Sequence, residues 1–280
     1  MGFQPVTPCL LARQPPMPSA TPKHFDKHDL YELCVQNPEA CIPLLNAIHA
    51  KNPRILAEDF AGTAILSQQW ADQSTEHRAI ATDLDQDALS KHPDHPRVTK
   101  VCADVNQSTD QADIIFVGNF SIGYHHTRAQ LLTYLKQAHA RLEASNGTFL
   151  CDTYGGENAF IPGGVHRPTP MGDGRLCRYT WEQRDADPLT SMVKNYIHFR
   201  IEHAGTITEE YDEAFEYHWR LWSVPELTDA MIEAGFSTTN VYNKLPDAVD
   251  DEGNAYINPI QDPQEELDDS YIVLVAATAS

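Results

Sequence analysis

The sequence predicts an α/β protein whose seven-stranded, mostly parallel sheet carries an antiparallel β insertion. Short apolar runs alternate with helical patterns between residues 53 and 156, which is typical of a parallel sheet covered on both faces. Beyond residue 174, three runs rich in aromatic and β-branched residues follow one another across turn signals, as in an antiparallel meander. The seven strands predicted for the main sheet are 54–60, 79–82, 98–103, 113–117, 147–151, 237–242 and 271–277.

The 280 residues are predicted to form five segments. In chain order these are a flexible, proline-rich leader at 1–25, a helical cover at 26–52, an α/β core at 53–156, a loop with the antiparallel insertion at 157–222, and the completion of the core at 223–280. Glycine and proline predict a loop up to residue 174. The strands predicted for the insertion are 176–183, 192–203 and 207–222.

Composition excludes several classes of function. With 41% apolar and 21% charged residues, the chain has the composition of a globular protein with a sizeable core. Its 20 basic and 40 acidic residues leave a formal charge of −20, whereas nucleic acids and anionic lipids are bound by basic surfaces. No apolar run approaches the roughly 18 residues of a membrane span. We therefore expect neither a nucleic acid nor a membrane as partner.

The cysteines and histidines suggest neither disulfides nor a metal site. The six cysteines include no C-x-x-C pair, and a chain of this length needs no disulfides for stability. They are predicted to be the reduced thiols of a cytoplasmic protein. His92 and His95 have a spacing that could bind a metal, but they lie in a proline-flanked loop with no obvious third ligand, so no metal is expected.

Carboxylates stand where three of the predicted strands end. Glu58 or Asp59 closes the first strand, Asp83 the second and Asp104 the third. Ligands of open parallel sheets bind beyond these carboxyl ends, and a carboxylate after the second strand can accept both hydroxyls of an adenosine ribose. The alternative for each acid is a helix N-cap. Neither G-x-G-x-x-G nor G-x-x-x-x-G-K-[ST] occurs, so a phosphate-cradling loop is not indicated.

Three motifs in this order resemble the class I S-adenosylmethionine-dependent methyltransferase family, which has a Rossmann-like sheet. Residues 58–64 (EDFAGTA) resemble its first motif, an acid followed by a glycine-rich turn. Residues 83–89 (DLDQDAL) resemble its second motif, whose first acid holds ribose, and residues 103–105 (ADV) its third, whose acid meets the adenine amino group. The resemblance covers roughly residues 54–156 and 219–277. Residues 26–36 and 179–183 are also similar to a bacterial subgroup of these enzymes.

The resemblance implies S-adenosyl-L-methionine as the cofactor of the α/β core. Phe60 and Ala64 stand where the family has two of its first-motif glycines, which leaves Gly62 at the tightest point of the turn. The sulfonium cation of the cofactor suits a turn lined by Glu58 and Asp59. The residues expected to bind the cofactor are Tyr31, Gln36, Glu58, Asp59, Phe60, Ala61, Gly62, Thr63, Asp83, Leu84, Asp104, Val105, Asn119 and Phe120.

Residues 119–126 follow the fourth predicted strand. In the resembling family, the segment at this place faces the methyl group of the cofactor. Methyl transfer requires alignment of a nucleophile and, for some acceptors, removal of a proton. In this segment Asn119 is a candidate to orient the nucleophile through its side-chain carbonyl, Tyr124 to bound the pocket, and His125 or His126 to act as base. The alternative is that both histidines are solvated loop residues.

We expect a methyltransferase that acts on nitrogen or oxygen of a small cationic or neutral molecule, enclosed between the cofactor sheet and the aromatic-rich insertion. Tyr31, Gln36 and Tyr154 are candidates for a lid, although aromatic residues on helices also commonly belong to the core. The Phe-Ala-Gly turn also resembles nucleic-acid base methyltransferases, which the charge and the lack of an Asn-Pro-Pro-Tyr type motif disfavour. A non-catalytic S-adenosylmethionine-binding protein is the other alternative. The insertion could also form the interface of a homodimer.

Overall fold

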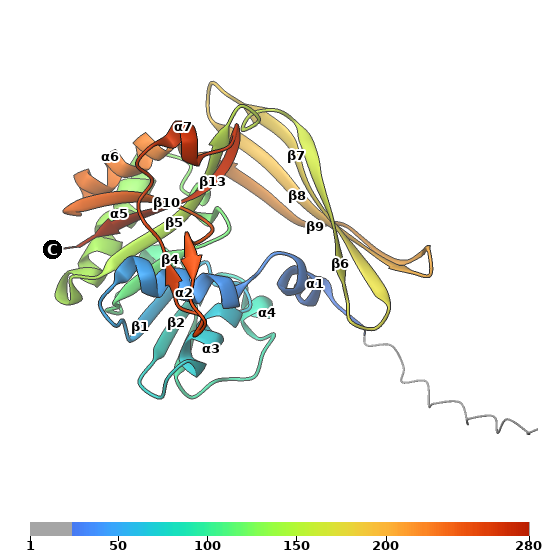
Figure 1. Ribbon diagram of the computed structural model, residues 1–280, viewed down its shortest axis with the longest axis horizontal. Coiled ribbons are helices and arrows are strands. Elements are labelled where there is room, and N and C mark those ends of the chain that lie inside the picture. The colour runs from blue at the N-terminus through green and yellow to red at the C-terminus, as the bar shows by residue number, and fades with distance from the viewer. Residues whose placement is uncertain (1–23, 280) are drawn as a thin grey trace, which may run out of the picture.

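The computed structural model describes residues 24–279, so most of the predicted leader lies outside the described residues. Its centre is a seven-stranded sheet in the order β10-β13-β5-β4-β1-β2-β3 (Figure 1). β13 pairs antiparallel with both of its neighbours, and the other pairs are parallel. The predicted fold class is confirmed. The strands are β1 (Ile55–Asp59), β2 (Arg78–Asp83), β3 (Val98–Cys102), β4 (Ile114–Val117), β5 (Thr148–Gly156), β10 (Thr238–Asn243) and β13 (Ser270–Thr278).

The strand order reverses between β1 and β4. From β1 the chain continues outward through β2 and β3, and it then returns to β4 on the other side of β1. In sheets of this kind the connections on either side of the reversal leave a crevice at the carboxyl ends of the strands, where ligands bind. The topology therefore brings the segments that follow β1, β2, β3 and β4 to one edge of the sheet.

Most of the helices begin at residues whose side chains accept hydrogen bonds from free backbone N–H groups. The helices are α1 (Lys27–Cys34), α2 (Pro38–His49), α3 (Ile65–Asp72), α4 (Gln86–Leu89), α5 (Arg128–Leu142), α6 (Val224–Ala234) and α7 (Pro263–Glu266), with the short 3-10 helices η1 (Val105–Gln107), η2 (Ser121–Tyr124) and η3 (Glu143–Ser145). Thr127 and Gln130 form a capping box at the start of α5, and Ser223 and Glu226 form another before α6. α6 ends at Gly235, whose φ is 115°. Such local signals fix where the longer helices begin and end.

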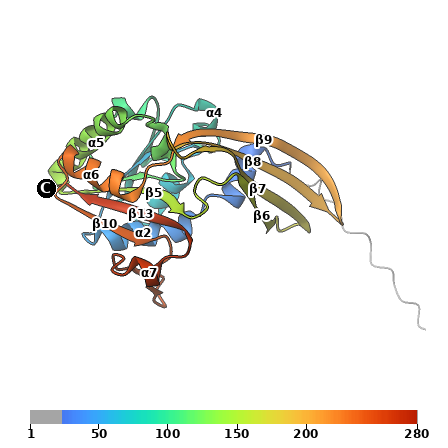
Figure 2. The same cartoon turned by 90° about the horizontal axis from the view of Figure 1, so that it is seen from above.

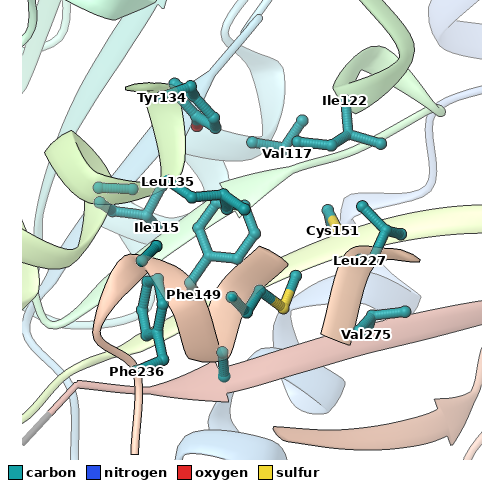
Figure 3. Packing of buried hydrophobic residues seen from close by; sticks show 14 of the residues in the cluster. Ile115, Val117, Ile122, Tyr134, Leu135, Phe149, Cys151, Leu227, Phe236 and Val275 are labelled. Atoms are coloured by element: carbon teal, nitrogen blue, oxygen red, sulfur yellow. The ribbon is translucent and has the colours of Figure 1, made fainter. Parts of the chain in front are cut away.

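Alternation of side chains along the strands divides the core into two layers. Ile115 and Phe149 point to one face and pack against α5 and α6, as Figure 3 shows around Phe149 and Phe236. Their neighbours Ile114 and Leu150 point to the other face, where α2 and α3 cover them. Figure 2 shows α5 and α6 on one side of the strands and α2 on the other.

A buried ion pair connects the central strand to α5. Asp59 shares a face of β1 with Ala57, and α5 covers this face. Its carboxylate accepts hydrogen bonds from Nη1 and Nη2 of Arg141 at 2.6 and 3.2 Å, and from the Tyr134 hydroxyl at 2.7 Å. The side chains of Asp59 and Arg141 are 0% and 2% exposed. The two charges therefore compensate each other, and the Tyr134 hydroxyl on Asp59 and the Asp110 backbone carbonyl, which accepts the Arg141 Nε–H at 3.2 Å, add further hydrogen bonds.

The insertion is a four-stranded antiparallel sheet in the order β6-β7-β8-β9, and it extends from the core as a curved arm (Figures 1 and 2). Its strands are β6 (Gly163–Pro170), β7 (Arg175–Asp187), β8 (Met192–His203) and β9 (Thr206–Arg220). The loop predicted up to residue 174 is therefore corrected, because β6 occupies much of it. Pro168 and Pro170 lack a backbone donor, and they are accommodated because β6 is an edge strand that pairs on one side only.

Helix α1 packs against one face of the insertion sheet. Leu30 and Cys34 of α1 lie in one apolar cluster with Cys177 of β7 and Phe199 of β8. The Sγ atoms of Cys34 and Cys177 are 3.5 Å apart, and both are free thiols. The next helix, α2, packs on the main sheet, so the two N-terminal helices join the insertion to the core.

The acidic segment between β10 and β13 contains short elements of its own. It holds the short hairpin of β11 (Ala248–Val249) and β12 (Ala255–Tyr256), followed by α7. Two-residue strands carry too short a pattern to be recognised in sequence. Within residues 24–279, no helix is both long enough and apolar enough to cross a membrane.

We predict that Arg141→Met lowers the free energy of unfolding by about 3–5 kcal/mol, because it leaves the Asp59 charge buried without its partner. Chemical denaturation measures this loss. The double variant Asp59→Leu/Arg141→Met should recover part of it, since no charge then remains buried. Equal losses in the single and double variants would show that the ion pair is not the cause.

Candidate active site

A cavity of about 830 Å³ lies beyond the carboxyl ends of β1 to β4. Volumes of this size suit a small-molecule ligand. The turns after these four strands, the first half of α5, helix α1 with the residues after it, and strand β9 form its walls. The lining residues are His28, Tyr31, Gln36, Phe60, Gly62, Thr63, Asp83, Leu84, Asp85, Ala88, Ala103, Asp104, Val105, Asn106, Asn119, Ser121, Tyr124, His125, Ala129, Gln130, Thr133, Phe215 and Tyr217.

The turn after β1 is left-handed at three positions, of which one is glycine. Phe60, Gly62 and Ala64 have φ values of 62°, 55° and 60°. This conformation costs a residue with a side chain roughly 1–2 kcal/mol, and such strain concentrates at functional sites. A Cβ added to Gly62 would meet no atom within 4 Å, because the position opens into the cavity. The backbone of the turn is therefore exposed to a ligand at Gly62.

Asp83 ends β2 and holds this turn. Its Oδ2 accepts a hydrogen bond from the Gly62 N–H at 2.7 Å, and its Oδ1 accepts one from the Asp85 N–H at 2.8 Å. Asp104, after β3, accepts the backbone and side-chain amides of Asn106 on Oδ1 at 2.9 and 2.8 Å. A carboxylate has about four acceptor sites, so both acids can also accept hydrogen bonds from a ligand. Asp104 is at once the N-cap of η1 and a cavity residue, which unites the two alternatives considered from the sequence.

The turn after β4 is also left-handed, and neither of its left-handed residues is glycine. Asn119 and Phe120 have φ values of 54° and 64° and lead into η2. Asn119 and Tyr124 line the cavity. The ring of Tyr124 stacks on that of Phe60 with centroids 5.7 Å apart. The turns after β1 and β4 therefore meet at this aromatic pair.

His125 lines the cavity, whereas His126 points elsewhere. The His125 ring stacks on Tyr134 at 4.6 Å between centroids, and only 4% of the residue is exposed. Burial lowers its pKa to about 4, although Asp104 opposes this shift, so the ring is neutral at pH 7. Its Nε2 is buried and has no hydrogen-bond partner among the described residues. The His126 Nε2 instead bonds the His218 carbonyl at 2.7 Å.

Helix α1 and strand β9 form the wall of the cavity nearest the insertion. The rings of Tyr31 and Phe215 lie 5.0 Å apart, and Phe215 stacks on Tyr217 at 6.4 Å. Gln36 lies across from the first turn, where its Oε1 accepts a hydrogen bond from the Thr63 hydroxyl at 3.5 Å. The insertion thus contributes aromatic side chains to the same cavity as the strand ends.

Glu58 and Asp59 lie on opposite faces of β1, and within residues 24–279 neither belongs to the cavity lining. Asp59 points to α5 and pairs with Arg141, so the turn is not lined by it as predicted. Glu58 points to α3, where its Oε2 accepts hydrogen bonds from the Ser67 N–H at 3.0 Å and hydroxyl at 2.6 Å. Burial raises the pKa of Glu58 to about 7. Each acid therefore anchors one helix beside the first strand.

The other predicted site residues divide in the same way. Ala61 is buried behind the turn, and the ring of Phe120 packs against Tyr154 at 5.0 Å. Tyr154, a predicted lid residue, donates its hydroxyl to the Gln183 Oε1 at 2.9 Å and is outside the lining in the described chain. The predicted residues that the structure brings together at the cavity are Tyr31, Gln36, Phe60, Gly62, Thr63, Asp83, Leu84, Asp104, Val105, Asn119, Tyr124 and His125.

Several lining residues were not identified from the sequence. Ala129, Gln130 and Thr133 lie on one face of α5 at the spacing of a helical turn, which is the only signal the sequence carried for them. Phe215 belongs to an aromatic-rich strand whose cavity-facing members only the fold could identify.

The charge of the lining has one sign. Among the described residues, those that line the cavity include Asp83, Asp85 and Asp104 but no lysine or arginine. Such a lining favours neutral or cationic ligands over anionic ones. The described chain contains no group of three or more side chains able to hold a metal ion. His92, for example, pairs with Glu32 at 2.6 Å.

The fold is similar to that of several solved structures. No protein-family model and no curated protein matches the sequence. DesVI from Streptomyces venezuelae is 15% identical with a TM-score of 0.65, covering 90% of this chain and 97% of its own. CalS10, an amino pentose methyltransferase from Micromonospora echinaspora with bound S-adenosylmethionine, is 14% identical with a TM-score of 0.63, covering 93% and 100%. The sugar N-methyltransferase KedS8 from a Streptoalloteichus species is 14% identical with a TM-score of 0.59, covering 96% and 98%.

These similarities extend over nearly the whole chain, the insertion included. The fold is that of the S-adenosylmethionine-dependent methyltransferases, as the resemblance of the motifs implied. At these identities the comparison establishes the fold, and the activity is a separate inference from the site.

We predict that Glu58→Gln changes how stability depends on pH. A folded-state pKa of about 7 against 4.5 means that the folded protein binds this proton more tightly than the unfolded chain, so the stability contributed by Glu58 falls as the pH rises from about 4.5 to 7. Glutamine has no such ionisation. The free energy of unfolding of the variant, taken relative to that of the wild type, should therefore rise by about 2–3 kcal/mol between pH 4.5 and pH 8, as measured by denaturation at both pH values. An unchanged difference would contradict the raised pKa.

Proposed function

We propose that this protein is an S-adenosylmethionine-dependent methyltransferase that acts on a nitrogen or oxygen atom of a small molecule. The observation that carries this proposal is the left-handed turn after β1, where Gly62 opens into the cavity and Asp83 holds its N–H. Two features fit a bound cofactor. A Cβ at Gly62 would project into free space, and the buried Nε2 of His125 lacks a partner in the described chain.

The residues at the ends of β2 and β3 would hold the adenosine part of the cofactor. Asp83 would accept the ribose hydroxyls, and Asp104 the adenine amino group, with Leu84 and Val105 as apolar contacts. Both acids have acceptor sites beyond those used by backbone amides. Leu84 is 72% exposed, and a bound ring would cover apolar surface of this kind.

When bound, S-adenosylmethionine supplies a methyl group activated by its sulfonium cation. The chain then has to hold the acceptor atom in line with that methyl group, which is a positioning task. The Asn119 side chain can orient the acceptor by hydrogen bonding, and Tyr124 and Phe60 bound the space in front of the turn. His125, neutral at pH 7, can accept a proton or a hydrogen bond but is a weak base at a pKa of about 4.

The acceptor is proposed to be small and neutral or cationic. The cavity carries three carboxylates, and its described lining has no lysine or arginine to bind phosphate. Tyr31, Phe215 and Tyr217 offer aromatic faces, which attract ammonium groups as well as apolar rings. CalS10 and KedS8 are described as acting on an amino pentose and a sugar nitrogen, so amino sugars are the first acceptors to test. The same charges disfavour a nucleic-acid acceptor.

Calorimetry with S-adenosylmethionine tests the cofactor site. The wild type should bind it, and Gly62→Val should weaken binding by about 100-fold or more, because the new side chain would occupy ligand space. Gly172→Val is the matched control, since Gly172 is also left-handed, at φ 79°, with no atom near its Cβ direction, but lies outside the described lining. It imposes similar backbone strain and should bind normally. Loss of binding in both variants would attribute the effect to strain.

Transfer of a radiolabelled methyl group to amino sugars and to a metabolite pool then separates an enzyme from a binding protein. An enzyme releases S-adenosylhomocysteine in step with a labelled product. A non-catalytic binding protein retains the cofactor unchanged.

We predict that Asn119→Ala lowers kcat by about 10- to 100-fold while the Kd of S-adenosylmethionine changes by less than about threefold, because only acceptor alignment is lost. Tyr124→Phe should have a smaller effect of the same kind. Tyr256→Phe, at a tyrosine that is 56% exposed in β12, is the control and should match the wild type. Equal losses in kcat and in cofactor affinity would make Asn119 part of the cofactor pocket instead.

A further inference from the structure

One buried carboxylate at the ligand edge has no part in the cavity lining of the described chain. Asp152 lies on β5, directly after the residue that pairs with the last residue of β4. It is 0% exposed. A buried carboxylate is costly unless charged or hydrogen-bonding partners compensate it, so its partners indicate its task.

The partners of Asp152 are the turn after β4 and a lysine. Its Oδ1 accepts a hydrogen bond from the Phe120 N–H at 2.6 Å, and its Oδ2 accepts one from the Asn119 N–H at 3.1 Å. The Lys244 Nζ lies 2.6 Å from Oδ2. Both carboxylate oxygens are thus engaged by two consecutive backbone amides and one ammonium group.

These contacts hold a backbone conformation that the local sequence disfavours. Asn119 and Phe120 are both left-handed, and two such residues in succession are unfavourable without glycine. In this conformation successive N–H groups point to the same side, where one carboxylate can accept both. Asp152 therefore compensates the strain of the turn that presents the Asn119 side chain to the cavity.

Lys244 supplies the counter-charge from outside the turn. It follows β10, so its side chain passes the β13 strand to reach β5. Burial lowers the pKa of Lys244 and the neighbouring Asp152 carboxylate raises it. The effect of Asp152, together with its hydrogen bond, is the larger, so the pKa lies above its usual value. The lysine is therefore charged. Its Nζ also lies 5.5 Å from the centre of the Phe120 ring, so it contacts the turn from a second side.

We propose that Asp152 is a positioning residue for methyl transfer, with Lys244 as its partner: the pair holds the turn at Asn119 in the geometry that aligns the acceptor, without touching cofactor or acceptor. The inference rests on the proposed function. The turn after β1, on the side of the cavity where the cofactor is proposed to bind, has a separate acceptor in Asp83. Loss of Asp152 should therefore impair alignment of the acceptor and leave cofactor binding unchanged.

The first test compares turnover with cofactor affinity. Asp152→Asn places an amide donor against one of the two N–H groups, so kcat should fall by about 10-fold or more, while the Kd of S-adenosylmethionine changes by less than about threefold. Lys244→Met should give the same pattern, and Lys244→Arg, which keeps the charge, should retain turnover. Glu233→Gln breaks the exposed ion pair with Arg128 and serves as control. A kcat loss below 10-fold in both Asp152→Asn and Lys244→Met, or a matching loss of cofactor affinity, overturns the proposal.

Hydrogen exchange tests the contacts without an acceptor. The amides of Asn119 and Phe120 should be protected in the wild type and exchange about 10-fold or more faster in Lys244→Met, whereas the Gly62 amide, held by Asp83, should be unchanged. Unprotected amides in the wild type overturn the proposal. Should Asp152→Asn fail to fold, the two Lys244 variants carry both measurements. A wild type that binds no S-adenosylmethionine refutes the proposed function instead, and the exchange result still stands as a statement about the turn.

Discussion

Carboxylates that accept backbone N–H groups determine the form of the ligand edge of this sheet. Asp83 holds the turn after β1 through Gly62, and Asp152 holds the turn after β4 through Asn119 and Phe120. Left-handed turns built largely without glycine need such acceptors, because unpaired backbone donors at a buried position are costly. The cavity between strands and insertion depends on both turns keeping this shape.

Two buried acids behind the cavity also hold neighbouring elements in place. Asp59 and Glu58 are neighbours in sequence, yet Asp59 pairs with Arg141 on α5 and Glu58 accepts hydrogen bonds from Ser67 in the first turn of α3. A strand directs successive side chains to opposite faces, so the two acids necessarily serve different helices. Helices α3 and α5 are thereby attached to opposite faces of β1, and neither acid belongs to the cavity lining of the described chain.

The cavity joins two parts of the molecule with different tasks. The parallel sheet contributes backbone and carboxylates at its strand ends, whereas α1 and β9 contribute aromatic faces such as those of Tyr31 and Phe215. Under the proposed function, the first part binds the cofactor and the second selects the acceptor. Changes in the insertion would then alter acceptor choice while leaving cofactor binding intact.

The sequence by itself determined most of the strands and helices along the chain and the acids at the strand ends, because periodicity, capping residues and turn signals act over a few neighbours. It also indicated Gly62, Asp83, Asp104 and Asn119 for the cavity. It missed β6 and the short β11–β12 hairpin. Only the tertiary structure decided that Asp59 turns away from it, since the face of a strand depends on which helix covers it. It likewise decided that Asp152 holds the turn at Asn119, because partners 33 residues apart meet only when β4 and β5 pair.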